Sequence, residues 1–191
     1  DFTFIFVGNV DVEKMKPAIT EYLGALPAVN RKETFKDNKI EMRQGIYKFR
    51  FTKQQETPKA SVFAFYNGDC KYDLRNNLLL SMTSQILDLV YTEKVREDEG
   101  GTYGVYVGGT LQKYPKEKAI LQIIFDTAPE KKEKLMKIIF GEIDNITKTG
   151  PSEANLNKVK EYMLKKHTED LKENSYWLGS IDAVSYTHLR A

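Results

Sequence analysis

Residues 95–104 bring together side chains that could bind a peptide at the end of a helix. They read Val-Arg-Glu-Asp-Glu-Gly-Gly-Thr-Tyr-Gly, so three consecutive acids stand just before two glycines. The negative end of a helix dipole disfavours acidic side chains, and local conflicts of this kind concentrate at working sites. Arg96 and Tyr103 both donate hydrogen bonds to carbonyl or carboxylate oxygens. A turn at Gly100 and Gly101 would bring these two donors to one rim of the fold.

The same residues also have an ordinary structural interpretation. Arg96 could pair with one of the acids that follow it, and the two glycines could simply end the helix. Tyr103 alternates with Val105 and Val107, so it could share their strand face and belong to the core. The spacing of the residues leaves both interpretations open.

Metal ligands and nucleophiles are scarce in this sequence. The histidines are His167 and His188, and the lone cysteine is Cys70. Because His-x-x-Glu-His is absent and no second cysteine is available, we expect no zinc site within the chain. His167 falls on the apolar stripe of the last predicted helix, where we expect it to be partly buried at a helix–sheet contact. Cys70 has no neighbour in the sequence that would favour its thiolate.

The composition excludes several classes of protein. The chain has 191 residues, of which 41% are hydrophobic, enough for one domain with a core. The 12% aromatic content argues against disorder, and a net charge of +2 gives no reason to expect a nucleic-acid partner. No apolar run approaches the roughly 20 residues that cross a bilayer. The abrupt start at Asp1 suggests a piece of a longer protein, and no signal segment indicates its compartment.

Hydrophobic periodicity predicts an α+β fold in two layers, with a mostly antiparallel sheet and helices packed on it. The order of elements is expected to be βαββαββαα. Predicted strands cover residues 2–7, 47–52, 60–66, 102–111 and 118–126, and predicted helices cover residues 12–26, 72–99, 128–149 and 152–174. The third helix is expected to begin with a capping box from Thr127 to Glu130.

No linker or repeat divides the chain, so residues 1–183 are expected to form a single domain. Residues 184–191 follow no periodicity. We interpret them as an irregular tail left by cloning or sequencing, and they carry no functional argument.

Residues 95–105 resemble the Arg-x6-Tyr motif in the C-terminal half of pitrilysin/insulinase-family zinc metallopeptidases, the inverzincins. Three further segments are similar to the same family: Phe-Thr-Phe-Ile-Phe-Val-Gly-Asn-Val-Asp at residues 2–11, Tyr-Leu-Gly-Ala-Leu-Pro at 22–27 and Asn-Ser-Tyr-Trp-Leu at 174–178. The resemblance extends to about residue 182. The chain departs from the family after Trp177, where the final helix looks shortened or replaced.

This resemblance implies a half-domain of the pitrilysin/processing-peptidase type and an enzyme whose two halves close around a peptide. The active half of the family carries His-x-x-Glu-His and a further glutamate, which this chain lacks, so the chain resembles the C-terminal, non-zinc half. By the resemblance, Arg96 and Tyr103 would contact the substrate backbone and the oxyanion. Substrate-binding positions would also include Gly100, Gly101 and Thr102.

We therefore expect a non-zinc, substrate-binding domain of a zinc metalloendopeptidase that is inactive by itself. Zinc is expected in the partner half, and the expected partners are a peptide and that zinc-bearing half or a companion subunit. One alternative is a non-catalytic structural or assembly subunit with the same fold. Another is a free-standing peptide- or nucleic-acid-binding module. The sequence that precedes Asp1 would discriminate among the three.

Overall fold

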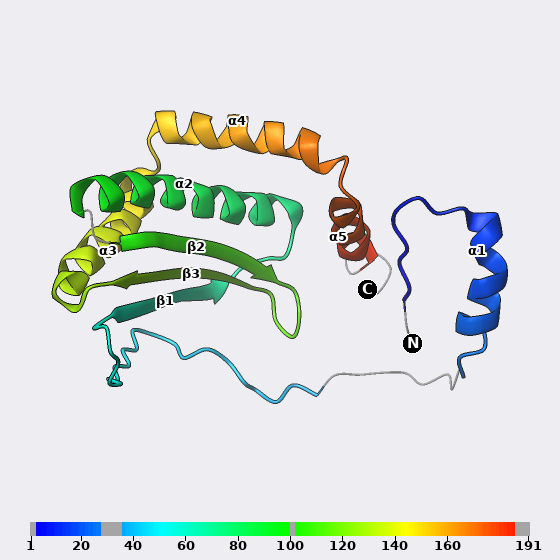
Figure 1. Cartoon of the computed structure of the whole chain (residues 1–191), viewed down its shortest axis with the longest axis horizontal. Coiled ribbons are helices and arrows are strands. Elements are labelled where there is room, and N and C mark those ends of the chain that lie inside the picture. Colours follow the sequence, from blue (N-terminus) through cyan, green and yellow to red (C-terminus); the bar gives the residue numbers. More distant parts are fainter. Residues whose placement is uncertain (1–2, 28–35, 100–101, 186–191) are drawn as a thin grey trace. The chain divides into compact units, whose positions relative to one another are not determined.

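The computed structural model describes residues 3–27, 36–99 and 102–185 (Figure 1). The chain divides into two compact units. One consists of residues 37–161, and the other combines residues 1–36 with residues 162–191.

The unit of residues 37–161 contains a three-stranded antiparallel sheet covered by helices. The strands are β1 (Ala60–Asp69), β2 (Thr102–Gln112) and β3 (Lys118–Thr127), in the spatial order β1-β3-β2. Helix α2 (Leu74–Glu99) connects β1 to β2 and lies over the sheet (Figure 1). After β3, a short 3-10 turn (Pro129–Lys131) leads into α3 (Lys132–Thr149), and α4 (Glu153–Asp170) begins in this unit.

Alternate residues of the central strand β3 build the core. Ile123 and Phe125 are buried, and they pack against one side of α2 and α3. The buried helix residues of this cluster are Leu87, Tyr91, Val95, Leu135 and Ile139. Helix α2 lies so close to β2 that a Cβ added at Gly109 would come within 2.7 Å of both Leu80 Cγ and Ser84 Oγ. A glycine at this position therefore allows the helix layer to approach the sheet.

The opposite side of the sheet carries exposed aromatic side chains. Phe63 is 62% exposed, Phe65 is 50% exposed and Tyr106 is 56% exposed. Phe63 lies opposite Ile124, which in turn lies opposite Tyr106, so these three positions form one row across the sheet. We call this side, defined by Phe63, Phe65, Tyr106 and Ile124, the open face.

The other unit contains α1 (Val12–Ala18), its π-helical continuation (Ile19–Leu23) and α5 (Asn174–Val184). The side chain of Asp11 caps α1 by accepting a 3.1 Å hydrogen bond from the Lys14 amide. Residues 3–6 and α5 together line a shallow apolar cavity of about 550 Å³. The N-terminal segment and the last helix are thus neighbours within this unit.

The α+β class and the antiparallel sheet agree with the sequence analysis, but the predicted order βαββαββαα is not confirmed. Residues 3–7 and 47–52, both predicted to be strands, form no ladder with any other described residues. A strand needs a neighbouring strand to satisfy its backbone groups, and in the described part of the chain neither segment is paired with one. The observed order, from α1 to α5, has one strand before α2 and an additional helix at the end.

Two predicted boundaries also differ. Thr127 does not cap a helix, because it ends β3, and the 3-10 turn that leads into α3 follows the extended residue Ala128. Helix α5 continues to Val184, the first residue of the predicted irregular tail, while residues 186–191 lie outside the described residues.

Candidate substrate-binding site

The predicted site lies where α2 ends and β2 begins. Arg96 belongs to the last turn of α2, and Tyr103 is the second residue of β2. The side chains of both residues, together with that of Thr102, lie outside the described part of the structure, as do Gly100 and Gly101 entirely. The structure therefore places the backbone that carries the two donors at one end of the sheet.

A bulge in β2 interrupts the sheet at the predicted site. Thr102 is paired with Thr127 and Val105 with Phe125, so β2 advances three residues where β3 advances two. Gly104, within the bulge, has a φ of 135°, a conformation that favours glycine. A bulge adds one residue and turns the strand locally. The alternation that would put Tyr103 on the same strand face as Val105 is consequently broken at this point.

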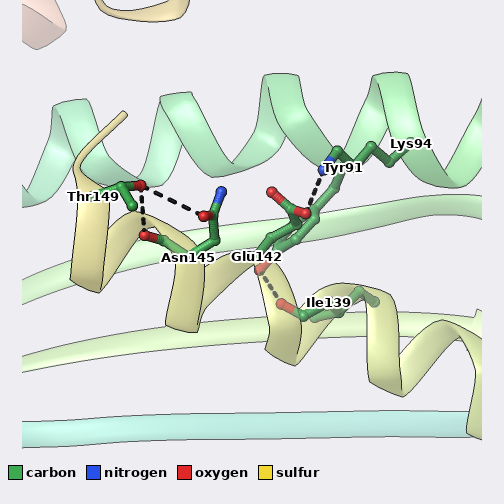
Figure 2. Close-up of polar contacts among 6 residues, drawn as sticks. All are labelled: Tyr91, Lys94, Ile139, Glu142, Asn145 and Thr149. Carbon is green, nitrogen blue, oxygen red and sulfur yellow. Dashed lines mark hydrogen bonds and ion pairs between the residues drawn. The ribbon is translucent and has the colours of Figure 1, made fainter. Parts of the chain in front are cut away.

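Contacts between α2 and α3 hold the end of α2 that leads into the site (Figure 2). The buried hydroxyl of Tyr91 donates a 3.0 Å hydrogen bond to the Ile139 carbonyl, and Lys94 forms an ion pair with Glu142. Tyr91 is only 1% exposed. These contacts fix α2 about one turn before Arg96, so the helix presents that position from a rigid support.

Tyr91 has a structural role rather than a chemical one. Burial, together with the nearby Tyr66 and Glu142, raises the pKa of the Tyr91 phenol well above its usual range. The hydroxyl therefore stays protonated and keeps its hydrogen bond to the Ile139 carbonyl at any physiological pH. A group with this pKa is unsuited to general acid–base catalysis near neutrality.

The structure adds a polar pair to the site that the sequence analysis missed. Asp126 is the β3 residue opposite the bulge, and its Oδ2 lies 2.9 Å from Lys59 Nζ. Hydrogen bonds from Ser61 and Lys59 lower the pKa of the Asp126 carboxyl, so it remains charged at neutral pH. No short-range signal could have found this pair, because strand pairing brings together residues 67 positions apart.

One buried hydroxyl also lies at this end of the sheet. Thr127, which ends β3 opposite Thr102, is 4% exposed. Its Oγ1 has no hydrogen-bond partner among the described residues. Thr127 was predicted to be a helix cap, and sequence reasoning therefore did not assign it to the site.

Among the described residues we searched for groups of side chains that could hold zinc. Within the described ranges, no three histidine, cysteine, aspartate or glutamate side chains gather in a group that could hold a metal ion. Cys70 is a free thiol that points its Sγ toward the Lys71 carbonyl, 3.9 Å away. His188 lies outside the described residues.

His167 is not partly buried, in contrast to the prediction from the sequence. It is exposed on α4, and its ring meets the Tyr176 ring edge-on, with the two centroids 5.6 Å apart. Its Nδ1 lies 3.4 Å from the Tyr176 hydroxyl. This part of α4 contacts α5, to which Tyr176 belongs.

The two predicted site residues are of types that donate hydrogen bonds, a guanidinium and a phenol. Helix α2 packs against α3 before it reaches Arg96, and β2 is paired with β3 on both sides of Tyr103, at Thr102 and at Val105. No helix in the described ranges is both long and apolar enough to cross a membrane.

Comparisons with known proteins relate the chain to peptidases. Residues 1–163 match the family described as the peptidase M16 inactive domain. A curated Arabidopsis thaliana protein described as zinc protease PQQL-like is 23% identical over 194 aligned residues, which cover 94% of this chain and 20% of that protein. The chain thus spans about one fifth of the length of this relative.

Solved structures show a similar fold. The periplasmic protease PqqL from Escherichia coli has a TM-score of 0.72 and 20% identity over 95% of this chain and 20% of that one. A peptidase M16 inactive domain from Pseudomonas fluorescens has a TM-score of 0.57 and 25% identity over 70% of this chain and 32% of that one. The ferredoxin protease FusC, solved in complex with Arabidopsis ferredoxin, has a TM-score of 0.59 and 13% identity over 69% and 14% of the two chains.

Proposed function

Because the chain belongs to the peptidase M16 inactive-domain family, we propose that it binds substrate as the C-terminal, non-zinc domain of a zinc metalloendopeptidase. The resemblance to zinc metallopeptidases inferred from residues 95–105 is confirmed by this family match. The relatives whose descriptions name a protease are about five times longer than this chain, which leaves room for a zinc-bearing half elsewhere in the assembly. We also propose that residues 1–183 act as one domain, since the family match from residue 1 to 163 draws on both compact units.

The observation that carries the substrate-binding role is the position of Arg96 and Tyr103 on either side of one helix-to-strand junction. Helix α2 reaches this junction from a buried contact with α3, and β2 leaves it through a bulge. Bulges are frequent next to active sites because they re-aim a side chain. The junction can therefore present two donors to one extended ligand, and Gly100, Gly101 and Thr102 between them would allow the ligand backbone to come close.

In the complete enzyme, the zinc-bearing half supplies the metal and the activated water. The role of this chain is to bind the peptide and to orient it. The guanidinium of Arg96 suits a backbone carbonyl of the bound peptide, because its planar set of donors holds one orientation. The phenol of Tyr103 suits the oxyanion that develops during hydrolysis, where a preorganised donor acts more strongly than in the ground state.

The proposed partners follow from this role. One is a peptide or protein segment in an extended conformation, and the other is the zinc-bearing half, on the same chain or on a companion subunit. FusC, a neighbour in fold, was solved with a ferredoxin bound. That structure supports the idea that enzymes with this fold can take a folded protein as a partner.

The experiment that tests this function is steady-state kinetics of Tyr103→Phe in the complete enzyme. The substitution keeps the ring and removes only the hydroxyl, so kcat should fall by about 10²–10³-fold while KM changes little. Tyr162→Phe is a matched control, because it removes an exposed hydroxyl on α4.

A kcat of Tyr103→Phe close to that of the unmodified enzyme would contradict the proposal. A loss of activity that is fully explained by a lower melting temperature would do the same. Either result would favour the alternative of a non-catalytic structural or assembly subunit.

A further inference from the structure

The strand β1 leaves one edge of the sheet open to pairing. Within the described residues it pairs with β3 alone, along its full length from Ala60 to Asp69. Residues 61–68 read Ser-Val-Phe-Ala-Phe-Tyr-Asn-Gly and include neither a charge nor a proline. Proteins usually protect exposed edges with such residues or with short strands. We therefore expect β1, a ten-residue edge strand that lacks this protection, to pair with another strand.

Residues 47–52 have the sequence of a strand but are paired with no other strand in the described part of the chain. Tyr47, Phe49 and Phe51 alternate with Lys48, Arg50 and Thr52. Phe49 is 74% exposed and Phe51 is 77% exposed, yet their ring centroids are 5.8 Å apart. Two residues at i and i+2 meet in this way when the backbone is extended, because both side chains lie on one side of it. We call residues 47–52 the strap.

Three ion pairs, made by Glu41 and Arg50, place the chain around the strap beside β1. Glu41 pairs with Lys116 and with Lys118, and Lys118 is opposite Asp69 at the end of β1. At the other end, Arg50 Nη2 lies 3.4 Å from Glu133 Oε1 in the first turn of α3. This turn follows Thr127, which is opposite Ala60 at the start of β1.

The ion pairs of Glu41 and Arg50 define the direction of the chain between these two residues. As residue numbers rise from 41 to 50, the chain runs from the Asp69 end of β1 to its Ala60 end, which is the reverse of the direction of β1 (Figure 1). The Glu41–Lys116 and Arg50–Glu133 ion pairs are exposed, so they indicate the path of the chain and contribute little to stability.

We propose that the strap closes onto the free edge of β1 as a fourth, antiparallel strand. If residue 52 is placed opposite residue 60, Phe49 faces Phe63 and Tyr47 faces Phe65. All four rings then lie on the open face. Arg50 follows Phe49 directly, so its side chain points to the opposite face of the strand, which is the helix side of the sheet. This agrees with its contact to Glu133 of α3.

Closure of the strap would protect the sheet in two ways. It satisfies the outer backbone groups of β1, and it covers aromatic surface through cross-strand pairs. Two or three aromatic pairs of this kind favour the closed state by about tenfold. A closed strap also occupies the edge of β1, so a second copy of the chain or an extended peptide cannot pair with it.

Amide hydrogen exchange on the full chain tests the proposal. We expect alternate amides of the strap to exchange about tenfold more slowly than an unstructured segment. Phe49→Pro should abolish this protection, because proline fixes φ at about −65°, away from the extended value of a strand, and the substitution removes the ring that would face Phe63. Gln54→Pro is the control, since residue 54 lies in the stretch between the strap and β1 and outside the ladder. Neither site is buried, so both variants should keep the fold.

Cysteine cross-linking tests the register. In a Cys70→Ser background, the pair Phe49→Cys and Phe63→Cys should form a disulfide within one chain under mild oxidation. The pair Phe49→Cys and Val62→Cys is the control, because Val62 faces the helices.

Three results would overturn the proposal. The first is strap amides that exchange at the rate of an unstructured chain. The second is protection that survives Phe49→Pro. The third is cross-linking between chains that rises with protein concentration, which would show that a second copy occupies the edge.

Discussion

Arg96 and Tyr103 have different chemical tasks in the proposed function, and kinetics can separate them. Tyr103 would act on the developing oxyanion, so its loss should appear in kcat. Arg96 would hold a carbonyl of the bound peptide before and during the reaction. An interaction that exists in both states changes KM as well as turnover.

We predict that Arg96→Ala lowers kcat/KM of the complete enzyme by about 10–100-fold, the equivalent of a charge-assisted hydrogen bond. KM should rise, in contrast to Tyr103→Phe. Arg96→Lys should recover only part of the loss, because an ammonium cannot reproduce the planar geometry of a guanidinium. The measurement is steady-state kinetics with thermal melts alongside.

Arg75→Ala is the control for Arg96→Ala. Arg75 is an exposed arginine near the start of α2, at the opposite end of the same helix. If both variants lose activity equally, a general effect of charge on the enzyme explains the result, and Arg96 has no specific contact with the substrate.

Asp126 and Lys59 show how the tertiary structure adds to a site. Asp126 is the β3 residue opposite the bulge of β2, so two opposite charges stand at this end of the sheet without adding net charge. Because Asp126 stays ionised, the pair keeps its geometry through the neutral pH range. It can therefore help to hold the bulged part of the sheet in one conformation.

Helix α2 is the element on which the candidate site depends. It spans the sheet from Leu74 to Glu99, and its buried side packs against β2, β3 and α3. The polar contacts in Figure 2 anchor its second half. Since the site lies at the end of this helix, its position is sensitive to how closely α2 lies on β2.

We predict that Gly109→Ala destabilises the fold by about 1–3 kcal/mol, the usual cost of overpacking. The new methyl group would meet Leu80 Cγ and Ser84 Oγ at 2.7 Å. The Ser84 hydroxyl cannot move freely, because it donates a 2.9 Å hydrogen bond to the Leu80 carbonyl. The helix would have to lift from the strand, and chemical denaturation should report the loss.

Gly68→Ala is the matched control for this change. Gly68 is also a strand glycine, but no described heavy atom lies within 4 Å of the Cβ it would gain. Its replacement should leave the free energy of unfolding nearly unchanged. A similar loss in both variants would show that the cost comes from strand glycines in general and not from the contact with α2.

The assembly as a whole must combine this chain with a zinc-bearing half if the proposed function is correct. The family match and the fold similarity concern the inactive domain, which spans only a part of the related proteases.

We predict that the purified chain holds no stoichiometric zinc and cleaves no peptide. Elemental analysis after dialysis against zinc should find far less than one equivalent per chain, and a peptide library should remain intact. Adding the zinc-bearing half should restore cleavage. About one zinc per chain that disappears in His167→Ala would contradict both this prediction and the assignment of the domain.

The sequence alone determined much of the local structure and the family. The spacing of apolar residues located α2, α3 and α4, and the alternation of side chains located β1, β2 and β3. Arg96 and Tyr103 were predicted together as site residues because they belong to one continuous motif, and their role stays a prediction. Patterns of this kind involve residues that are close together in the chain, so they can be interpreted without the tertiary structure.

The tertiary structure decided which strand-like segments find partners. Residues 3–7 and 47–52 have strand patterns as clear as that of β1, but a pattern does not specify which edge will accept it. The ion pair of Lys59 with Asp126 and the hydrogen bond from Tyr91 to Ile139 join residues 67 and 48 positions apart. The bulge before Val105 arises from the register between two strands. Pairing, register and burial depend on which surfaces meet, so no single segment of the sequence encodes them.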